Sequence, residues 1–185
     1  MKSVLISIQP KWCELIASGK KTVEVRKTKP KLETPFKVYI YCTSSNVHEC
    51  LMQNESGVKL IYACNYKTAI PIGGNISNGK VIGEFVCDEI FPIRVFENGS
   101  IQDYDCHNME RSCVHYYDIS EYIGNNKTGY GWHISDLVIY DESKPINEFV
   151  SASILNTNCF GRHLKRLDSP PQSWCYVEEV DNDRT

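Results

Sequence analysis

The sequence has no excess of basic residues and no long apolar run. Its 20 lysines and arginines are outnumbered by 23 acidic residues, which gives a formal net charge of −3. Non-specific binding of long duplex DNA relies on a basic surface that displaces counterions, so we expect no such partner. No stretch approaches the ~18 apolar residues of a membrane-spanning helix, and we expect no membrane partner.

The nine cysteines lack the pattern of a secreted disulfide framework. Their count is odd, their positions are scattered, and the first residues, MKSVLISIQPKW, lack the features of a signal peptide. We therefore expect a cytoplasmic protein with reduced thiols. Four residues of metal-ligand type lie close together in the sequence: Cys106, His107, Cys113 and His115. Their spacing lacks the close pairing of structural zinc sites, and we expect neither a metal nor a cofactor.

The length and composition favour one domain. With 185 residues, of which 42% are hydrophobic, the chain is long enough to bury a core, and we expect residues 1–185 to form a single domain. The pattern shows no βαβ alternation, which indicates an α+β fold. A short helix is expected over 10–18. Strands are expected over 3–9, 22–26, 36–42, 79–91, 130–140 and 173–180.

Two segments, approximately 43–78 and 92–125, have weaker signals, and we interpret them as insertions between barrel strands. In the first, NVHECLMQ suggests a helical turn. In the second, residues 92–112 look irregular, and a short helix with a capping box of Asp118 and Glu121 should end at Gly124. Gly83, within the expected strand 79–91, indicates a bulge or a close approach of another backbone.

The most informative stretch is GKKTVEVR, residues 19–26, which follows the expected helix. Its two valines alternate with polar residues as in a half-buried strand, so Glu24 and Arg26 share one face. Strict alternation places Lys21 on the valine face, and it joins the other two only if the chain turns immediately after Gly19. This polar row indicates the wall of a cleft; the alternative is an edge strand with solvated charges.

The pattern Gly19-x-Lys21-x-x-Glu24-x-Arg26 resembles the signature of the ASCH domain. Five further segments agree with that family in order along the chain: SIQPKW, FKVYIYCT, GKVIGEFVCDEI, YGWHISDLVIYDESKPINEF and PPQSWCYVEE. Together they resemble the long phage-associated and bacterial form of the domain. The resemblance implies a PUA-like mixed β-barrel with a few short helices packed on it, and RNA or a nucleotide as the partner.

The resemblance and the residue chemistry together predict a ligand-binding cleft beside the first helix. Arg26 offers a planar donor fork for a phosphate or a base edge, and Glu24 can accept from an exocyclic amine. Lys21 adds a movable point charge. The expected ligand-binding residues are Ser7, Gln9, Trp12, Lys21, Glu24, Arg26, Trp132 and His133.

A bound base also needs a flat apolar partner, because stacking on an aromatic ring contributes on the order of 1–3 kcal/mol per base. The candidates are Trp12, Trp132 and Trp174, and the resemblance favours Trp132 with its neighbour His133. Packing in the core or the cleft wall is the alternative for Trp12 and Trp132. A hydrogen-bonded structural role is the alternative for His133.

An enzymatic role stays open, and catalytic residues are unknown. Some small ASCH-like proteins are amidohydrolases on acylated cytidine that use a threonine nucleophile and an assisting lysine. Lys21 matches that lysine, but Glu24 occupies the position of the nucleophile and could act only as a carboxylate or on a water. If the protein is an enzyme, Lys21 and Glu24 are the candidates, in a hydrolase on a modified nucleoside or in a ribonuclease. The sequence favours binding.

Overall fold

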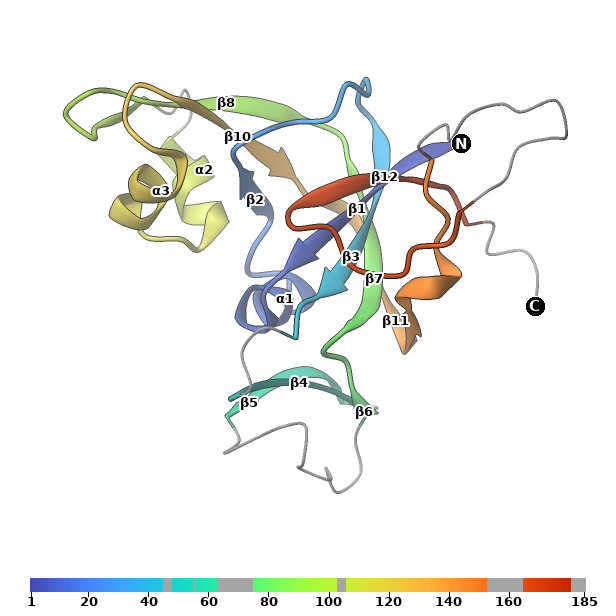
Figure 1. Ribbon diagram of the computed structural model, residues 1–185. Helices are drawn as coiled ribbons and strands as arrows, with labels where there is room; N and C mark the ends of the chain where they lie inside the picture. The colour runs from blue at the N-terminus through green and yellow to red at the C-terminus, as the bar shows by residue number, and fades with distance from the viewer. Residues whose placement is uncertain (45–47, 55, 63–74, 103–105, 153–164, 181–185) are drawn as a thin grey trace, which may run out of the picture. The chain divides into compact units, whose positions relative to one another are not determined.

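The computed structural model describes residues 1–44, 48–54, 56–62, 75–102, 106–152 and 165–180 (Figure 1). The chain divides into two compact units. Unit 1 comprises Met1–Glu14, Lys37–Phe85 and Val138–Thr185, and unit 2 comprises Leu15–Phe36 and Val86–Leu137.

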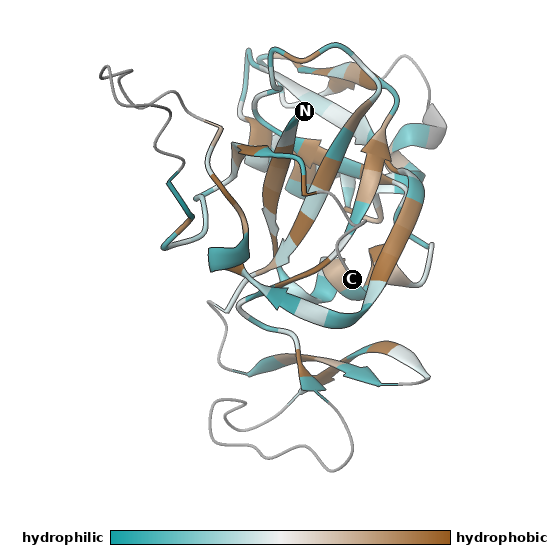
Figure 2. Ribbon diagram, turned by 90° about the vertical axis from the view of Figure 1, so that its right-hand side faces the viewer, coloured by the Kyte–Doolittle hydropathy of each residue, from teal (hydrophilic) through white to brown (hydrophobic). Residues whose placement is uncertain are grey.

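Most of a five-stranded sheet lies in unit 1. Its strands are β1 (Lys2–Ile8), β3 (Phe36–Cys42), β7 (Lys80–Cys87), β11 (Ser135–Pro145) and β12 (Trp174–Glu178). Their order is β11-β7-β3-β1-β12, with β1 parallel to β3 and antiparallel to β12. The central strands β1, β3 and β7 are mostly buried, as expected of strands covered on both faces. Figure 2 shows hydrophobic segments along the strands.

The core of unit 1 is built from residues far apart in the sequence. One cluster of buried side chains packs Leu5, Tyr39, Tyr41, Val81, Phe149 and Val177 together. The strand predictions over 3–9, 36–42 and 173–180 are confirmed to within two residues at each end. The 3-10 helix Ile146–Glu148 then carries the chain to the buried Phe149.

Helix α1 (Pro10–Ala17) begins and ends as its sequence predicts. The carbonyl of Gln9 accepts the N–H groups of Trp12 and Cys13, and Pro10 occupies the first turn, where a missing N–H costs nothing. At the other end, Gly19 has φ +73, a conformation that residues with a Cβ rarely adopt. This glycine turns the chain from the helix into the motif.

A second sheet of unit 1 contains β4 (Glu49–Asn54), β5 (Gly57–Tyr62) and β6 (Asn75–Ile76), in the order β5-β4-β6. The prediction of a helical turn in NVHECLMQ is therefore wrong from residue 49 onward. The turn after β4 explains the error, since Asn54 accepts the N–H of Ser56 and Gly57 takes φ +109. These local signals for a hairpin outweigh a short apolar run.

Unit 2 holds a four-stranded antiparallel sheet with two helices. Its strands are β2 (Val23–Arg26), β8 (Ile90–Val95), β9 (Ile101–Gln102) and β10 (Thr128–His133), in the order β2-β10-β8-β9. The helices are α2 (Cys106–Ser112) and α3 (Tyr116–Ile123). The prediction of an irregular segment over 92–112 is wrong, because it holds most of β8, all of β9 and α2.

Two predicted long strands are each two strands in the structure. The segment 79–91 divides into β7 and β8 at Asp88 and Glu89. The segment 130–140 divides into β10 and β11 at Ile134, and Asp136 has φ +45 just beyond it. Alternating hydrophobicity continues through both breaks, so the pattern alone does not locate them.

Helix α3 is capped differently from the prediction. His115, and not Asp118, is the N-cap, and its side chain accepts the N–H of Tyr117. Asp118 lies inside the first turn, where a carboxylate still favours the helix dipole. The predicted end at Gly124 is confirmed, since its N–H bonds to the carbonyl of Ser120.

The predicted α+β class is confirmed, with strands in the majority and few, short helices. Six described cysteines carry free thiols, in line with the expectation of reduced thiols: Cys13, Cys42, Cys50, Cys87, Cys113 and Cys175. Burial raises the pKa of the Cys87 thiol to about 12. The side chains of the other three cysteines lie outside the described part. Within the described ranges, none of the helices combines the length and hydropathy needed to cross a bilayer.

Gly83 is the site of the close backbone approach that its position in the strand predicts. A Cβ at this residue would collide with the carbonyl oxygen of Val138 and lie 3.1 Å from the Cα of Ile139. We expect Gly83→Ala to lower the free energy of unfolding by about 1–3 kcal/mol, because two paired backbones would have to separate. Chemical denaturation measures this, with Lys80→Ala at the start of β7 as the control; equal midpoints for the wild type and Gly83→Ala would contradict it.

Candidate functional site

The path of the chain between α1 and β2 brings Lys21 to Glu24. After the turn at Gly19, the N–H of Lys21 bonds to the carbonyl of Leu15, so the chain folds back along the helix before β2 begins. This is the turn that the sequence required if Lys21 was to join Glu24 and Arg26. The condition is met.

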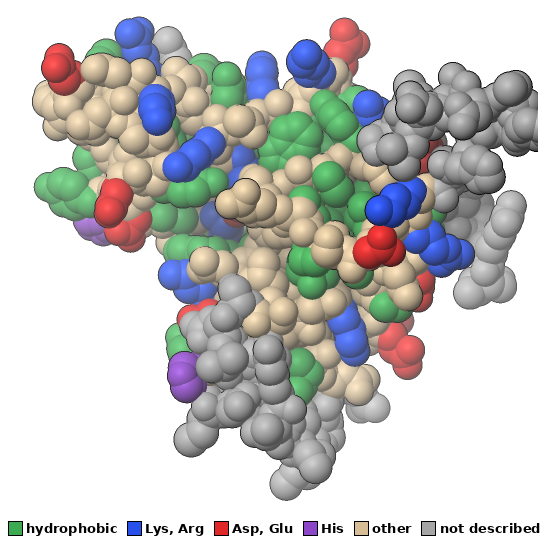
Figure 3. Space-filling model, viewed as in Figure 1, with side chains coloured by type: hydrophobic (Ala, Val, Ile, Leu, Met, Phe, Trp, Pro, Cys, Tyr) green, Lys and Arg blue, Asp and Glu red, His purple; other side chains and the backbone are tan. Residues whose placement is uncertain are grey.

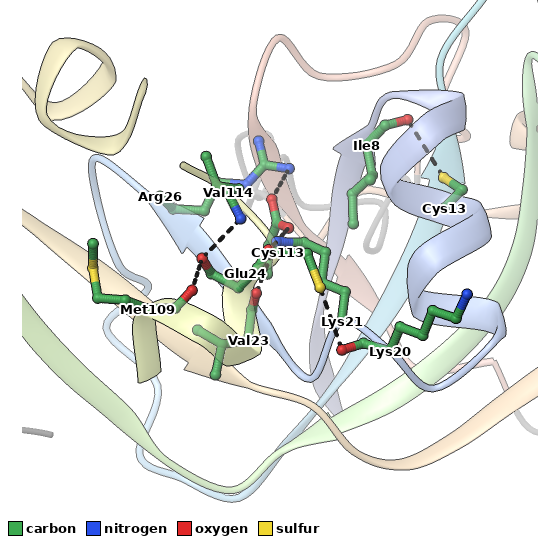
Figure 4. Close-up of polar contacts among 11 residues, drawn as sticks. Ile8, Cys13, Lys20, Lys21, Val23, Glu24, Arg26, Met109, Cys113 and Val114 are labelled. Carbon is green, nitrogen blue, oxygen red and sulfur yellow. Dashed lines mark hydrogen bonds and ion pairs between the residues drawn. The ribbon is translucent and has the colours of Figure 1, made fainter. Parts of the chain in front are cut away.

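Glu24 lies between two cationic groups (Figure 4). Its Oε2 is 3.3 Å from Lys21 Nζ, and its Oε1 is 3.0 Å from Arg26 Nη2. The exposed fractions are 1% for Lys21, 6% for Glu24 and 8% for Arg26. Charges so deeply buried are retained only where they are paired, which excludes a solvated edge strand as the explanation of this motif.

Lys21 also ties the motif to the end of helix α2. Its Nζ donates to the carbonyl oxygens of Val23 at 2.8 Å and Ser112 at 2.6 Å. Ser112 is the last residue of α2, where a cation favours the helix dipole. An ammonium group has three N–H donors, and Val23, Ser112 and Glu24 provide an oxygen for each.

The same helix end makes further contacts that fix its position. The hydroxyl of Ser112 donates to the carbonyl of Met109 and accepts the N–H of Val114. The thiol of Cys113 lies 3.4 Å from the carbonyl oxygen of Lys20 (Figure 4). The motif and the end of α2 therefore form one hydrogen-bonded structure.

The strand register places Trp132 beside Glu24. In the antiparallel pair of β2 and β10, Trp132 lies opposite Glu24, and Tyr130 lies opposite Arg26. Opposite residues in such a pair share a face of the sheet. Trp132 has an exposed fraction of 0% and packs edge-on against Phe36, with 6.0 Å between ring centroids. Its ring is core in this structure.

The other face of β10 explains the two glycines beside Tyr130. A Cβ at Gly131 would collide with the ring of Phe91, and one at Gly129 would lie 2.7 Å from Cγ1 of Ile123. Val25 belongs to the core cluster on this side. The glycines thus allow helix α3 and strand β8 to pack closely behind the motif.

His133 follows Trp132 and therefore lies on the opposite face from Glu24. Its Nδ1 is 2.6 Å from Oδ1 of Asp88, in the turn between β7 and β8. Partial burial raises the pKa of the Asp88 carboxyl, but the hydrogen bond with His133 and a backbone hydrogen bond outweigh it and hold the pKa below its usual value. The structure brings Trp132, and not His133, to the face of the motif.

A family model, the ASCH domain, matches residues 6–150. The chain belongs to the ASCH domain family. Two crystal structures of an ASCH protein from Zymomonas mobilis are similar to it. A tyrosine-to-phenylalanine variant of that protein has 15% identity and a TM-score of 0.55, covering 97% of this chain and 92% of the other. The unmodified protein has 17% identity and a TM-score of 0.51, covering 96% and 88%. Among curated proteins, none matches this sequence.

Three predicted site residues of this ASCH domain belong to unit 1. The buried Ser7 donates its hydroxyl to the carbonyl of Pro171 at 2.7 Å. Gln9 is exposed, and its backbone begins helix α1. Trp12 is half-buried, with Lys11 Nζ 4.5 Å from its ring centroid. The motif belongs to unit 2, so these three stay predicted members of the site.

In this ASCH domain, helix α2 contributes residues that contact the motif, and the sequence did not indicate them. Arg111 donates from Nε to the hydroxyl of Thr22 at 3.2 Å, and its carbonyl accepts the N–H of the same threonine. Asn108 lies one turn earlier and is 3.4 Å from Arg111 Nη1. The sequence pattern of this segment is irregular, and no local signal connects it with the motif. Arg111, a basic residue in the last turn, is the one feature that indicates the end of a helix here.

Proposed function

We propose that this ASCH domain binds RNA or a nucleotide through Glu24 and Arg26, with Lys21 as a positioning residue. One observation carries the proposal: a buried carboxylate is fixed between an ammonium and a guanidinium, 3.3 Å and 3.0 Å away. A buried ionic network of this kind costs desolvation energy that apolar residues would not. Its position on the same face of the sheet as the half-buried Tyr130 fits recognition of a polar, flat ligand.

The chemistry of the three side chains suits a nucleobase with its phosphate. A carboxylate accepts from an exocyclic amine, as glutamate does from cytosine N4. A guanidinium carries five N–H donors in a plane, a geometry that suits a phosphate or a base edge as well as the carboxylate of Glu24. Lys21, with its three donors directed at protein oxygens, fixes the orientation of Glu24.

The same arrangement supports binding over hydrolysis. Lys21 Nζ contacts the carbonyl oxygens of Val23 and Ser112 and the carboxylate of Glu24, which supports a positioning role over that of a base. The position that matches the nucleophile of the related amidohydrolases holds Glu24, whose two oxygens both lie against cations. The hydrolase and ribonuclease alternatives therefore have less support here.

Arg26→Gln tests the proposal. We expect the variant to lose about 1–3 kcal/mol of binding free energy, or roughly 5- to 150-fold in affinity, because it loses charge-assisted contacts with the ligand. Fluorescence anisotropy with a pool of labelled, randomised hexaribonucleotides measures the affinity, and competition with AMP and CMP measures binding of mononucleotides.

Lys59→Gln is the matched control, since Lys59 is an exposed cation in β5 of unit 1. It should bind as the wild type does. Equal affinities for Arg26→Gln, Lys59→Gln and the wild type would show that the motif is not part of the binding site. Mass spectrometry of nucleotides retained by the purified protein then identifies the base.

A further inference from the structure

The face of the unit 2 sheet that carries Glu24 and Arg26 extends beyond the motif. The register aligns Arg26 with Tyr130 and Pro92, Glu24 with Trp132 and Ile90, and Thr128 with Arg94 and Gln102. Opposite residues share a face, and so do residues two apart along a strand. We call this surface the motif face: Glu24, Arg26, Ile90, Pro92, Arg94, Gln102, Thr128, Tyr130 and Trp132.

Exposure increases along the motif face. Glu24 and Trp132 are buried at one end, Tyr130 is half-buried in the middle, and Arg94 and Thr128 are exposed at the other end. The face thus opens to solvent within one sheet and on residues of one unit. A ligand group held at Glu24 has a continuous, increasingly accessible surface beside it.

Two contacts between a cation and an aromatic ring each include one residue from the more accessible part of the motif face. Lys29 Nζ is 5.4 Å from the ring centroid of Tyr130, and Arg94 Cζ is 5.3 Å from that of Phe96. Figure 3 shows Lys and Arg side chains next to hydrophobic ones on the side of the molecule that it draws. Among the nine residues of the motif face, the one carboxylate is Glu24, which Lys21 and Arg26 already neutralise.

We infer that the motif face binds single-stranded RNA of more than one nucleotide. The inference rests on the proposed function: the base held by Glu24 and Arg26 has a neighbour, which stacks on Tyr130 while Lys29 and Arg94 contact its phosphates. Bases of a single strand are free to stack on aromatic rings, and cations nearby follow the backbone. Paired bases are not free to stack on a protein ring. A net charge of −3, with a few cations near this face, also fits a short single strand better than a long duplex.

The spacing of the sheet agrees with an oligonucleotide. Tyr130 is one strand spacing from Arg26, about 4.8 Å. Arg94 is two strand spacings and two residues along the strand from Arg26, or roughly 12 Å. A base seated at Glu24 therefore leaves Tyr130 and Arg94 for the next nucleotide.

Tyr130→Ala and Arg94→Gln test the inference. With the randomised hexaribonucleotides, we expect Tyr130→Ala to bind about tenfold more weakly, because a stacked base loses its platform. Tyr130→Phe should stay within about threefold of the wild type, since the ring remains. Arg94→Gln, at an exposed position, should reduce the slope of log affinity against log salt by about 0.7, the value for one phosphate contact on a single strand.

Two controls accompany these variants. Competition with AMP and CMP should be the same for Tyr130→Ala as for the wild type, because a mononucleotide does not reach the second position. Lys59→Gln should leave both affinity and salt slope unchanged. Thermal melting of each variant verifies that it is folded.

The outcomes separate the inference from the proposed function. Wild-type affinity for hexaribonucleotides in both Tyr130→Ala and Arg94→Gln, with Arg26→Gln still defective, would overturn the inference and leave the proposed function standing. Tighter binding of an RNA duplex than of the single strand, or equal affinity for AMP and hexaribonucleotides, would also overturn it. If the wild type binds neither AMP, CMP nor the hexaribonucleotides, both ideas are wrong.

Discussion

Replacing Glu24 with leucine is expected to lower the free energy of unfolding by about 3–5 kcal/mol, because Lys21 and Arg26 would then be buried cations without their shared carboxylate. Both side chains are less than a tenth exposed, so water cannot replace the lost partner. Removing one member of a buried ion network costs more than the network contributes in total, because the remaining charges stay desolvated. For a chain of this size the melting temperature should fall by roughly 6–20 °C.

Equilibrium unfolding in urea measures this loss of stability, and two further variants provide values with which to compare it. Glu24→Gln keeps an acceptor oxygen for Lys21 and Arg26 but loses the charge, so its loss should be smaller than that of Glu24→Leu. Glu33→Ala removes an exposed carboxylate from the same unit and should change stability by less than about 0.5 kcal/mol. If Glu24→Leu is no less stable than Glu33→Ala, the three charges are not a coupled buried network.

The expected stability loss also decides which variant can test binding. If a variant at Glu24 is partly unfolded, a loss of affinity cannot be assigned to a lost ligand contact. Arg26→Gln leaves Lys21 and Glu24 as a pair of opposite charges, so it removes the proposed ligand contact without leaving an uncompensated buried charge, and the hydrogen bond to Ser112 remains. We therefore base the binding test on Arg26 and the stability test on Glu24.

Much of the fold could be predicted because its signals are local. Strand β3 is a short run of mainly β-branched and aromatic residues with one lysine, and α1 starts at a proline and ends before a glycine. The grouping of Lys21, Glu24 and Arg26 was also accessible from sequence, since it required only a turn at Gly19. Each of these features depends on residues fewer than ten positions apart.

The remaining features depend on contacts between distant residues. The carbonyl of Ser112 that accepts from Lys21 is 91 positions away in the sequence, in a segment without clear periodicity. Helix α2 has seven residues, too few for a hydrophobic pattern to stand out. The N-cap of α3 is a histidine, which is not among the residues that usually mark a helix start.

The role of Trp132 also depends on contacts that the sequence does not reveal. The sequence left two roles open for Trp132, a stacking platform or a core residue, and the choice between them depends on burial, which no local pattern determines. The register with Glu24 places Trp132 on the motif face, while Phe36 and the surrounding core enclose its ring. Tyr130, one step along the same face, is the more accessible aromatic residue.

Trp132→Ala is accordingly expected to destabilise the fold by about 3–5 kcal/mol, the range for removing a large aromatic side chain from a core. Trp12→Ala is the control: Trp12 is half-buried with Lys11 near its ring, and its loss should cost about 1 kcal/mol. Urea unfolding of both variants measures the difference.

A double-mutant cycle assigns part of that loss to a named contact. Trp132 and Phe36 pack edge-to-face with an interplanar angle of 80°, an arrangement that contributes about 0.5–1.5 kcal/mol beyond area burial. The cycle of Trp132→Leu and Phe36→Leu should therefore show a coupling free energy of that size. If Trp132 were instead a platform that is filled only by ligand, Trp132→Ala would unfold at nearly the urea concentration of the wild type, and the coupling with Phe36 would be zero within error.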